Sequence, residues 1–317
     1  MGAIERDLHI DVPLSNMVIG FEPTGFIVQN IFPSVNVGKQ SDKYYKWTKG
    51  DFFRIVDTRR SRKTKGHSVE FSVSSDSYYA DNYALVHEFP FEDMINADVV
   101  LAGREKRARA IKNLLTLDWE NRVASMITSG TNLGSYTTLS GVNQWSDYTN
   151  SDPVNDVEVG KAAIRATTGL TPNILILGYD VMRKLKHHPD IIDRIKYVQK
   201  GVVTADVLAS VFEVEKVLVG TSIKNTGTEG LADSFSDVWG KNVVLLHTAS
   251  GADAAGVNPS VGYTFRWAAD MLGGREMAAE VWNDPDGGMF ENVRVQMFQD
   301  EKVTASELGY LIASAVA

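Results

Sequence analysis

Two adjacent histidines are the residues of this chain best suited to metal binding or acid–base chemistry. His187 and His188 stand directly before Pro189, where a predicted helix ends. Successive residues of a helix point in different directions, so a shared metal ion fits this pair poorly. A histidine at a helix C-terminus also places its cationic form near the negative end of the helix dipole. The sequence therefore favours a structural role for both side chains.

Two groups of carboxylates could bind a cation. The run NDPDGG at 283–288 places two Asp and two Gly together but lacks the other carboxylates and the final Glu of an EF-hand loop. A β-turn explains its composition better. The second group is Glu88, Glu92, Asp93 and Asp98, and such acids are favourable at the start of a helical region. We expect no metal ion at either group.

Composition excludes several classes of function. The 317 residues contain no Cys, which removes disulfides, thiolate metal sites and a Cys nucleophile. The glycine-rich nucleotide motifs, the H-E-x-x-H zinc motif and the G-x-S-x-G nucleophile motif are missing from the sequence. No apolar run approaches the roughly 18 residues of a membrane span, and the first residues do not resemble a signal peptide. The sequence predicts no catalytic, cofactor-binding or metal-binding residues.

A long arm is the most distinctive feature of the sequence. Two stretches of β character, 44–56 and 67–79, flank a polar tip, and Val69, Phe71 and Val73 alternate with polar residues in the second. At about 3.3 Å per residue, they predict a hairpin roughly 40 Å long. Because an isolated two-stranded hairpin is marginal in water, we expect this arm to lie on another surface.

Charge separates the arm from the rest of the chain. Residues 43–66 hold nine Lys or Arg and two Asp, a net charge of +7, and the whole chain carries −8, so the remainder carries −15. A basic arm on an acidic body can be attracted by the body of another copy. A second interpretation of the basic arm is a solvated hairpin whose charges protect a sheet edge from pairing. A third is nucleic-acid binding, but the acidic body would repel phosphate.

The other elements predict an α+β fold. Residues 1–40 contain regularly spaced prolines with apolar pairs between them, as in an extended strap. An apolar stripe with a 3.6-residue period predicts a long helix at about 100–129, whose charged face we expect to be solvated. A compact α/β unit follows, and its predicted buried strands are 174–177, 217–219 and 243–247.

This order of parts resembles the major capsid proteins of tailed double-stranded-DNA bacteriophages over nearly the whole chain. The junction between arm and loop in that family is similar to GFIVQNIFPSVNVGKQSDKYYKW at 25–47. Its axial domain is similar to residues 168–197 and 207–220. The resemblance implies an N-terminal arm, a long β-hairpin called the extended loop, a peripheral domain with a long spine helix and β strands, and a compact α/β axial domain.

The resemblance also implies domain boundaries. These are 1–40 for the N-terminal arm, 41–85 for the extended loop, 86–150 for the peripheral domain with its spine helix at about 100–129, 151–262 for the axial domain, and 263–317 for a return to axial and peripheral strands.

A structural virion protein rather than an enzyme is the function that the resemblance implies. Pentamers and hexamers would form an icosahedral or prolate capsid shell around packaged double-stranded DNA. The implied partners are further copies, scaffolding, portal and decoration proteins, and DNA held without sequence-specific binding; no membrane and no cofactor is implied. Assembly would take place in the host cytoplasm. Two alternatives stay open: a cellular nanocompartment shell protein of the same fold, and a soluble α/β enzyme with a dimerisation arm.

We expect contacts between copies to come from the arm and the strap. The basic candidates are Lys43, Lys46, Lys49, Arg54, Arg59, Arg60, Arg62, Lys63 and Lys65. The apolar and aromatic candidates are Trp47, Phe52, Phe53, Phe26, Ile31 and Phe32.

Overall fold

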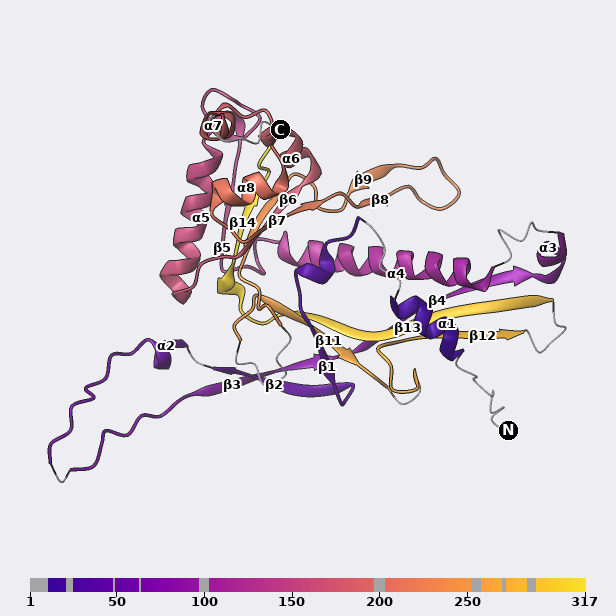
Figure 1. Ribbon diagram of the computed structural model, residues 1–317, viewed down its shortest axis with the longest axis horizontal. Coiled ribbons are helices and arrows are strands. Elements are labelled where there is room, and N and C mark those ends of the chain that lie inside the picture. Colours follow the sequence, from indigo (N-terminus) through magenta and orange to yellow (C-terminus); the bar gives the residue numbers. More distant parts are fainter. Residues whose placement is uncertain are drawn as a thin grey trace.

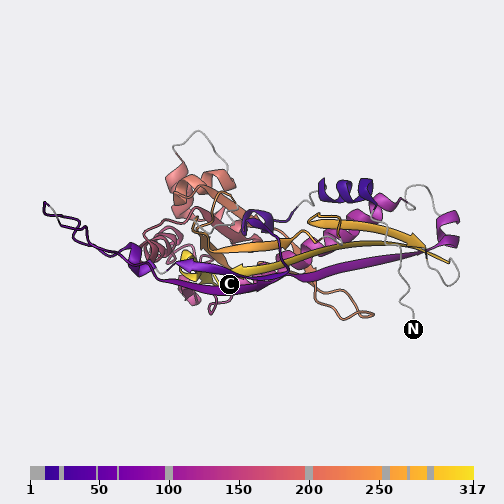
Figure 2. The same cartoon turned by 90° about the horizontal axis from the view of Figure 1, so that it is seen from below.

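The chain spreads as a flat plate from which a long arm projects. The computed structural model describes residues 11–20, 25–47, 49–62, 64–96, 103–196, 203–251, 258–269, 272–283 and 289–317. Figure 1 looks down the shortest axis of the molecule, and Figure 2 shows it edge-on, with the arm extending past one end of the plate. Lys63, Asp98 and residues 284–288 lie outside the described residues, as do the side chains of Trp47 and Phe52.

Helices and strands are mixed along the described residues. The helices are α1 (Val12–Gly20), α2 (Lys49–Phe52), α3 (Phe91–Asn96), α4 (Arg104–Ile127), α5 (Pro153–Thr168), α6 (Tyr179–Leu185), α7 (Pro189–Ile195) and α8 (Ala205–Phe212), with short 3-10 turns η1 (Val28–Asn30), η2 (Gly141–Asn143) and η4 (Ser306–Leu308). The strands are β1 (Ser34–Val37), β2 (Ser41–Trp47), β3 (Val73–Tyr79), β4 (Asp81–Pro90), β5 (Ser135–Thr138), β6 (Ile174–Gly178), β7 (Lys216–Gly220), β8 (Ile223–Asn225), β9 (Phe235–Asp237), β10 (Val243–Leu246), β11 (Gly262–Trp267), β12 (Met277–Asn283), β13 (Phe290–Val303) and β14 (Gly309–Ala313).

The first sheet is built around the long strand β13. This strand pairs antiparallel with β4, β12 and β11, and β1 adds to β11 in parallel. Because side chains alternate across a strand, Val293, Val295 and Met297 share one face, and they are buried in one cluster with residues of α1 and α4. The two helices thus cover one face of the sheet.

The second sheet has the order β5-β14-β10-β6-β7 and is buried on both faces. On one face, Leu175 and Leu245 pack with α5, α6, α7 and α8. On the other face, Ile176 and Leu246 pack with the second half of α4 and with η1. Burial on both faces explains the continuous apolar runs of these strands. The predicted strands at 174–177, 217–219 and 243–247 are confirmed as β6, β7 and β10.

Helix α4 connects the two sheets. The predicted stripe is confirmed, since its six described members are all buried: Ala108, Ile111, Leu115, Trp119, Val123 and Ile127. The expectation of a solvated charged face is wrong at two positions. Arg107 is buried in an ion pair with Glu291, and Lys112 donates to the carbonyl oxygens of Val18 and Ile19 at the C-terminal end of α1. A cation at this end satisfies carbonyls that have no partner within α1.

The N-terminal strap crosses its own subunit. Within it, residues 12–20 form α1, where an extended chain was predicted, because Pro13 lies in the first helical turn and removes no helical hydrogen bond. Further along, η1 packs on α4 and β1 joins the first sheet. A large part of the strap is therefore core of the same chain.

The arm has a shorter ladder than the sequence predicts. Strands β2 and β3 pair over seven residue pairs, from Ser41 with Tyr79 to Trp47 with Val73, which spans about 23 Å. Beyond the short helix α2, residues 53–72, called the distal arm below, form no strand among their described positions. The prediction of a paired hairpin roughly 40 Å long is therefore wrong, because the two strands stop pairing at Trp47 and Val73. The apolar side chains of Val69 and Phe71, which alternate in this stretch, stay about half exposed.

Candidate functional site

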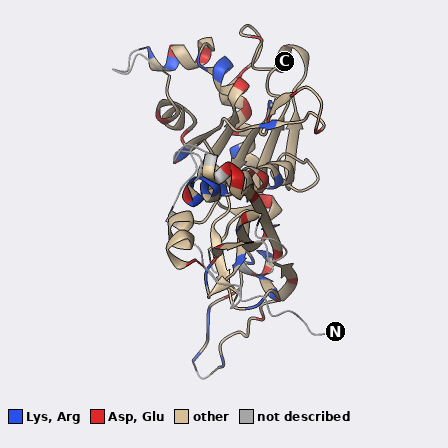
Figure 3. Cartoon of the chain, turned by 90° about the vertical axis from the view of Figure 1, so that its right-hand side faces the viewer, with Lys and Arg blue, Asp and Glu red and all other residues tan. Residues whose placement is uncertain are grey.

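The distal arm is the first candidate surface for contact between copies. The predicted basic contacts Lys43, Arg54, Arg59, Arg60, Arg62 and Lys65 are all exposed. Figure 3 shows Lys and Arg residues along the arm at the foot of that view. Exposed cations attract an acidic surface but contribute little stability to their own chain. Their role as contacts stays a prediction.

Two of the predicted lysines instead hold the arm to its own chain. Lys46 pairs with Asp76 across the β2–β3 ladder at 3.0 Å, and this hydrogen bond, together with a backbone N–H, holds the pKa of Asp76 below its usual range. Lys49 in α2 pairs with Glu307 next to the second sheet and donates to the carbonyl of Thr167. The root of the arm is thereby fixed to the body.

The predicted apolar contacts divide into exposed and buried groups. Phe53 is exposed at the start of the distal arm, and Phe26 is half-buried. Ile31 and Phe32 are fully buried in their own core with α4 and the second sheet, so their prediction as contacts between copies is wrong. The physical reason is that the strap covers its own subunit at this point. A short apolar run does not reveal which chain will cover it.

Other exposed apolar residues of the arm were absent from the predicted contacts. Ile55 is 100% exposed, and Val69, Phe71, Val73 and Tyr45 are also exposed. The alternation of apolar and polar residues at 69–73 was the sequence signal that could have identified Val69, Phe71 and Val73 as contacts. Together with the cations, they give the arm a surface that is both apolar and basic, which is typical of an interface with another chain.

A second exposed surface lies away from the arm, beside α4 (Figure 1). Strands β8 and β9 form a small hairpin that projects to the right of the second sheet in Figure 1, whereas the arm projects to the lower left. Leu231 at its tip is 73% exposed, Phe235 is 63% exposed, and Ile223 is also exposed. Sequence analysis predicted only a loop here, because strands of three residues give almost no periodic signal.

A buried carboxylate joins the base of this hairpin to the strap and to α4. Glu120 of α4 is fully buried. One carboxylate oxygen accepts from the backbone N–H groups of Ile27 and Val28 at 2.8 and 3.3 Å. The other accepts from Nε1 of Trp239 at 2.8 Å and from the hydroxyl of Ser222. Such hydrogen bonds to the charged form replace the water that a buried carboxylate loses.

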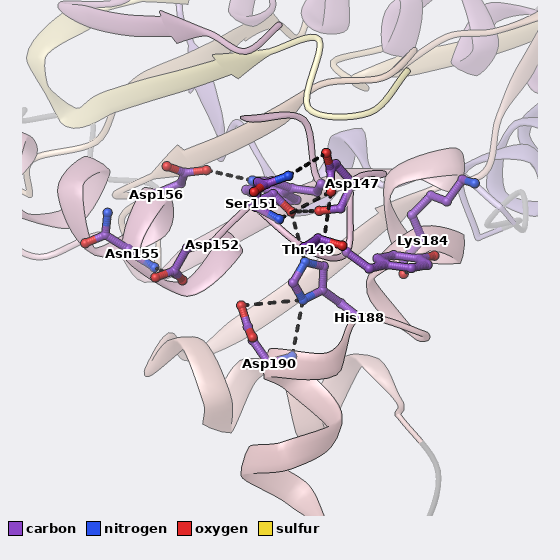
Figure 4. A network of polar contacts seen from close by, with 12 residues as sticks. Asp147, Thr149, Ser151, Asp152, Asn155, Asp156, Lys184, His188 and Asp190 are labelled. Carbon is purple, nitrogen blue, oxygen red and sulfur yellow. Dashed lines mark hydrogen bonds and ion pairs between the residues drawn. The ribbon is translucent and has the colours of Figure 1, made fainter. Parts of the chain in front are cut away.

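A Ser–His–Asp arrangement near the middle of the chain has the residue types of a hydrolase triad. Nε2 of His188 lies 3.0 Å from Oγ of Ser151, and Nδ1 lies 3.7 Å from a carboxylate oxygen of Asp190 (Figure 4). However, the Ser151 hydroxyl donates to the carbonyl of Asp147 at 2.6 Å, and the His188 side chain is fully buried. A nucleophilic serine must be reachable by substrate and must give its proton to the histidine. This arrangement meets neither condition.

The structure gives His188 a structural role. It is the N-cap residue of α7, where Nδ1 accepts from the backbone N–H of Asp190 at 3.3 Å. With Nδ1 accepting, Nε2–H donates to Ser151, which requires the neutral ring. Burial lowers the pKa of His188 against the opposing pull of Asp190 and Asp152. The predicted structural role is confirmed, but the predicted cation at a helix C-terminus is wrong, because Pro189 begins a new helix.

His188 predicts an acid-sensitive stability. Its folded pKa lies below the unfolded value of about 6.5, so as pH falls below that value the unfolded chain binds a proton that the folded chain does not. The contribution of His188 to the free energy of unfolding should be fully present above pH 6.5. It should decrease as the pH falls toward the folded pKa. Urea titrations at pH 7.5 and 5.5 measure this loss, and His188→Asn, which can still cap α7, should reduce it. An equal loss in both proteins would assign the acid sensitivity elsewhere.

Within the described ranges, no group of three His, Cys, Asp or Glu side chains is arranged to hold a metal ion. Glu92 and Asp93 lie in the first turn of α3, in agreement with the predicted helix start, whereas Glu88 lies in strand β4, where that prediction is wrong. The described helices include none that is long and apolar enough to cross a membrane.

Comparison with known proteins agrees with the fold. No family model matches the chain. The major capsid protein of Burkholderia phage BcepMu is 30% identical over 319 residues, which cover 99% of each chain. The crystal structure of a phage-related protein from Bordetella bronchiseptica RB50 superimposes with a TM-score of 0.76 and 27% identity, over 98% of this chain and 99% of that one.

The capsid structure of the cyanophage P-SCSP1u also shares the fold, with a TM-score of 0.58 at 11% identity over 93% of this chain and 90% of that one. These findings define a structural protein of a viral shell, not an enzyme. The chain belongs to the family of bacteriophage major capsid proteins, and its place is in the capsid of the virion. The resemblance and the α+β capsid fold stated from the sequence are both confirmed.

Proposed function

We propose that copies of this chain join as pentamers and hexamers into a closed icosahedral or prolate shell around packaged double-stranded DNA. The observation that carries this proposal is the distal arm, which projects from the plate with Ile55 fully exposed among cations. Rings form when one surface of a subunit binds a different surface of the next. An arm on one flank of a flat subunit supplies such a surface.

Charge supports a container for DNA that does not bind it tightly. Outside residues 43–66, the chain has a net charge of −15. Each contact between a cation and a phosphate adds affinity, and tight contacts would hinder the dense packing of DNA. An acidic body avoids this, while the basic arm is used between subunits.

We also propose the finer features that the family implies. The chain would follow the domain boundaries given above, with residues 41–85 as the extended loop and 151–262 as the axial domain. Scaffolding, portal and decoration proteins would be its partners during and after assembly. Support for these partners comes from the family relationship alone.

Electron microscopy of the purified chain, expressed alone and with its neighbouring phage genes, tests the proposal. We expect closed shells with five-fold vertices and six-fold faces. Shells that contain DNA distinguish a capsid from a nanocompartment, which would contain protein cargo. A small, fixed oligomer under every condition would contradict the proposal and favour the dimerising enzyme.

Assembly should depend strongly on salt. Because the Debye length falls from about 10 Å at 0.1 M salt to about 3 Å at 1 M, attraction between the basic arm and an acidic body weakens. We expect the rate of assembly, followed by light scattering, to fall at least several-fold over this range. In the variant Arg59→Gln, Arg60→Gln, Arg62→Gln, the rate should start lower and respond less. If the assembly rate of the natural chain does not change with salt concentration, attraction between charges does not drive assembly.

A further inference from the structure

The root of the arm contacts its own body at two separate points. The first point lies on the first sheet, where the rings of Tyr44 and Tyr78 are 5.4 and 4.7 Å from the ring of Phe265 in β11, measured between centroids. Tyr78 and Phe265 are buried there in one cluster. Aromatic rings at these separations attract one another beyond the effect of the area that they bury. The start of the β2–β3 ladder is therefore held on the first sheet.

The second point is α2, just beyond the far end of the ladder, where it lies near the end of α5 (Figure 1). Lys49 forms an ion pair with Glu307 of η4, and its Nζ donates to the carbonyl of Thr167 at 3.4 Å, in the last turn of α5. A cation is favourable there, because the last carbonyls of a helix carry partial negative charge. Ring atoms of Phe53 stand 3.3 Å from the position that a Cβ on Gly169 would take. We call these contacts of Lys49 and Phe53 the α2 latch.

Two points of contact fix the direction of the arm, whereas one point leaves it free to pivot. A ribbon of two strands is strongly twisted and only marginally stable by itself, because no third strand supports it. If α2 left α5 and η4, the arm would pivot about Tyr44 and Tyr78. The distal arm extends about ten residues past the latch, at most roughly 33 Å, so a pivot of about 10° would move its tip by about 6 Å. This displacement exceeds the distance between neighbouring strands in a sheet, about 4.8 Å.

The direction of the arm bears on the geometry of a shell. The angle between neighbouring subunits sets the curvature, and the curvature sets the number of copies that close the shell. Every copy carries the same arm, so a preference for one direction is repeated at every contact. With the latch closed, only the distal arm beyond α2 can adjust to different neighbours.

We propose that the α2 latch determines the size of the shell, because it restricts the arm to one direction and assembly to one curvature. Lys49 and Glu307 are the positioning residues. This inference rests on the proposed function, since it requires closed shells, and it goes beyond that function, since the latch joins two parts of one chain. The latch adds specificity more than stability, because an ion pair between half-exposed side chains contributes little to the free energy of unfolding.

Removing the ion pair tests the proposal. We expect the variant Lys49→Gln, Glu307→Gln to form shells whose diameters, measured by cryo-electron microscopy, are spread at least about twofold more widely than those of the natural chain. The urea midpoint of the unassembled subunit should stay unchanged, since the pair is half-exposed. Lys49→Arg keeps the cation and should keep a single size. Lys186→Gln is the matched control for the loss of one exposed lysine and should also keep a single size.

A covalent latch gives the converse test, because the natural chain contains no Cys. In the variant Lys49→Cys, Glu307→Cys, a short bis-maleimide joins the two thiols in the dilute, unassembled subunit. We expect mixed shell sizes without the reagent and the single size of the natural chain with it. Treatment of the same variant with a maleimide that has one reactive group controls for modification of the thiols alone, and these shells should stay mixed.

The outcomes separate this inference from the proposed function. Shells of a single size in the glutamine variant, or mixed sizes in the natural chain, overturn the latch and leave the shell function intact. If the glutamine variant is folded but forms no shell, the cross-linked variant decides. Shells of one size after cross-linking then support the latch, whereas mixed sizes or no shells overturn it. If the natural chain forms no shell under any condition, the proposed function fails, and this inference fails with it.

Discussion

Removing the distal arm should abolish closed shells and leave a folded subunit. Residues 54–70 can be replaced by a short Gly-Ser linker, because the backbone N–H of Ser72 already donates to the carboxylate of Asp51 at 2.8 Å. The ends of the cut therefore lie close together, and the β2–β3 ladder and the Lys49–Glu307 pair are kept. Lost are Ile55, Val69 and the basic residues of the tip.

Electron microscopy and size-exclusion chromatography measure this effect. We expect free subunits or small rings in place of shells, with thermal unfolding close to that of the natural chain, since the removed side chains are exposed. The neutral variant Arg59→Gln, Arg60→Gln, Arg62→Gln is the matched control for charge alone. It should assemble slowly but still close shells, because the apolar groups remain. Shells formed by the deletion variant as readily as by the natural chain would contradict the role given to the arm.

Replacing Glu120 by Ala should be the most destabilising single substitution of a polar residue in the described core. It removes the acceptor of four hydrogen bonds, from Ile27, Val28, Ser222 and Trp239. Each buried donor left without a partner costs about 1–3 kcal/mol, so we expect a loss of at least about 3 kcal/mol in the free energy of unfolding. Urea titration of the unassembled subunit measures it.

Two variants of α4 make this test specific. Glu105→Ala removes an exposed carboxylate from the same helix and should cost less than about 1 kcal/mol. Glu120→Gln keeps one acceptor oxygen but turns an amide NH₂ toward two donors, so its cost should approach that of Glu120→Ala. A cost near zero for both Glu120 variants would show that the strap and the hairpin base are held by apolar packing alone.

Local patterns explain which elements could be predicted from the sequence. The stripe of α4 and the apolar runs of β6, β7 and β10 were predicted because each repeats within a few residues. The short ladder of the arm was not predicted, because the alternation at 69–73 gives the period of a strand and not the chain on which it packs.

Non-local contacts explain what the sequence could not show. Ile31 and Phe32 have the composition of an exposed strap, and only the folded chain shows that α4 covers them. Glu120 accepts from a backbone group 93 residues earlier in the chain and from a side chain 119 residues later. No spacing rule connects positions so far apart. The β8–β9 hairpin, with strands of three residues, was missed for the opposite reason, since it is too short to give a period.

The end of the arm ladder at Trp47 and Val73 has a consequence for shell curvature. Beyond this point, no backbone ladder among the described residues would have to break if the distal arm tilted toward or away from the plate. Neighbouring subunits meet at a steeper angle around a five-fold vertex than within a flat six-fold face. In the shell proposed above, a tilt at this joint would let one sequence fit both environments, with the bending confined to the arm and both sheets left unstrained.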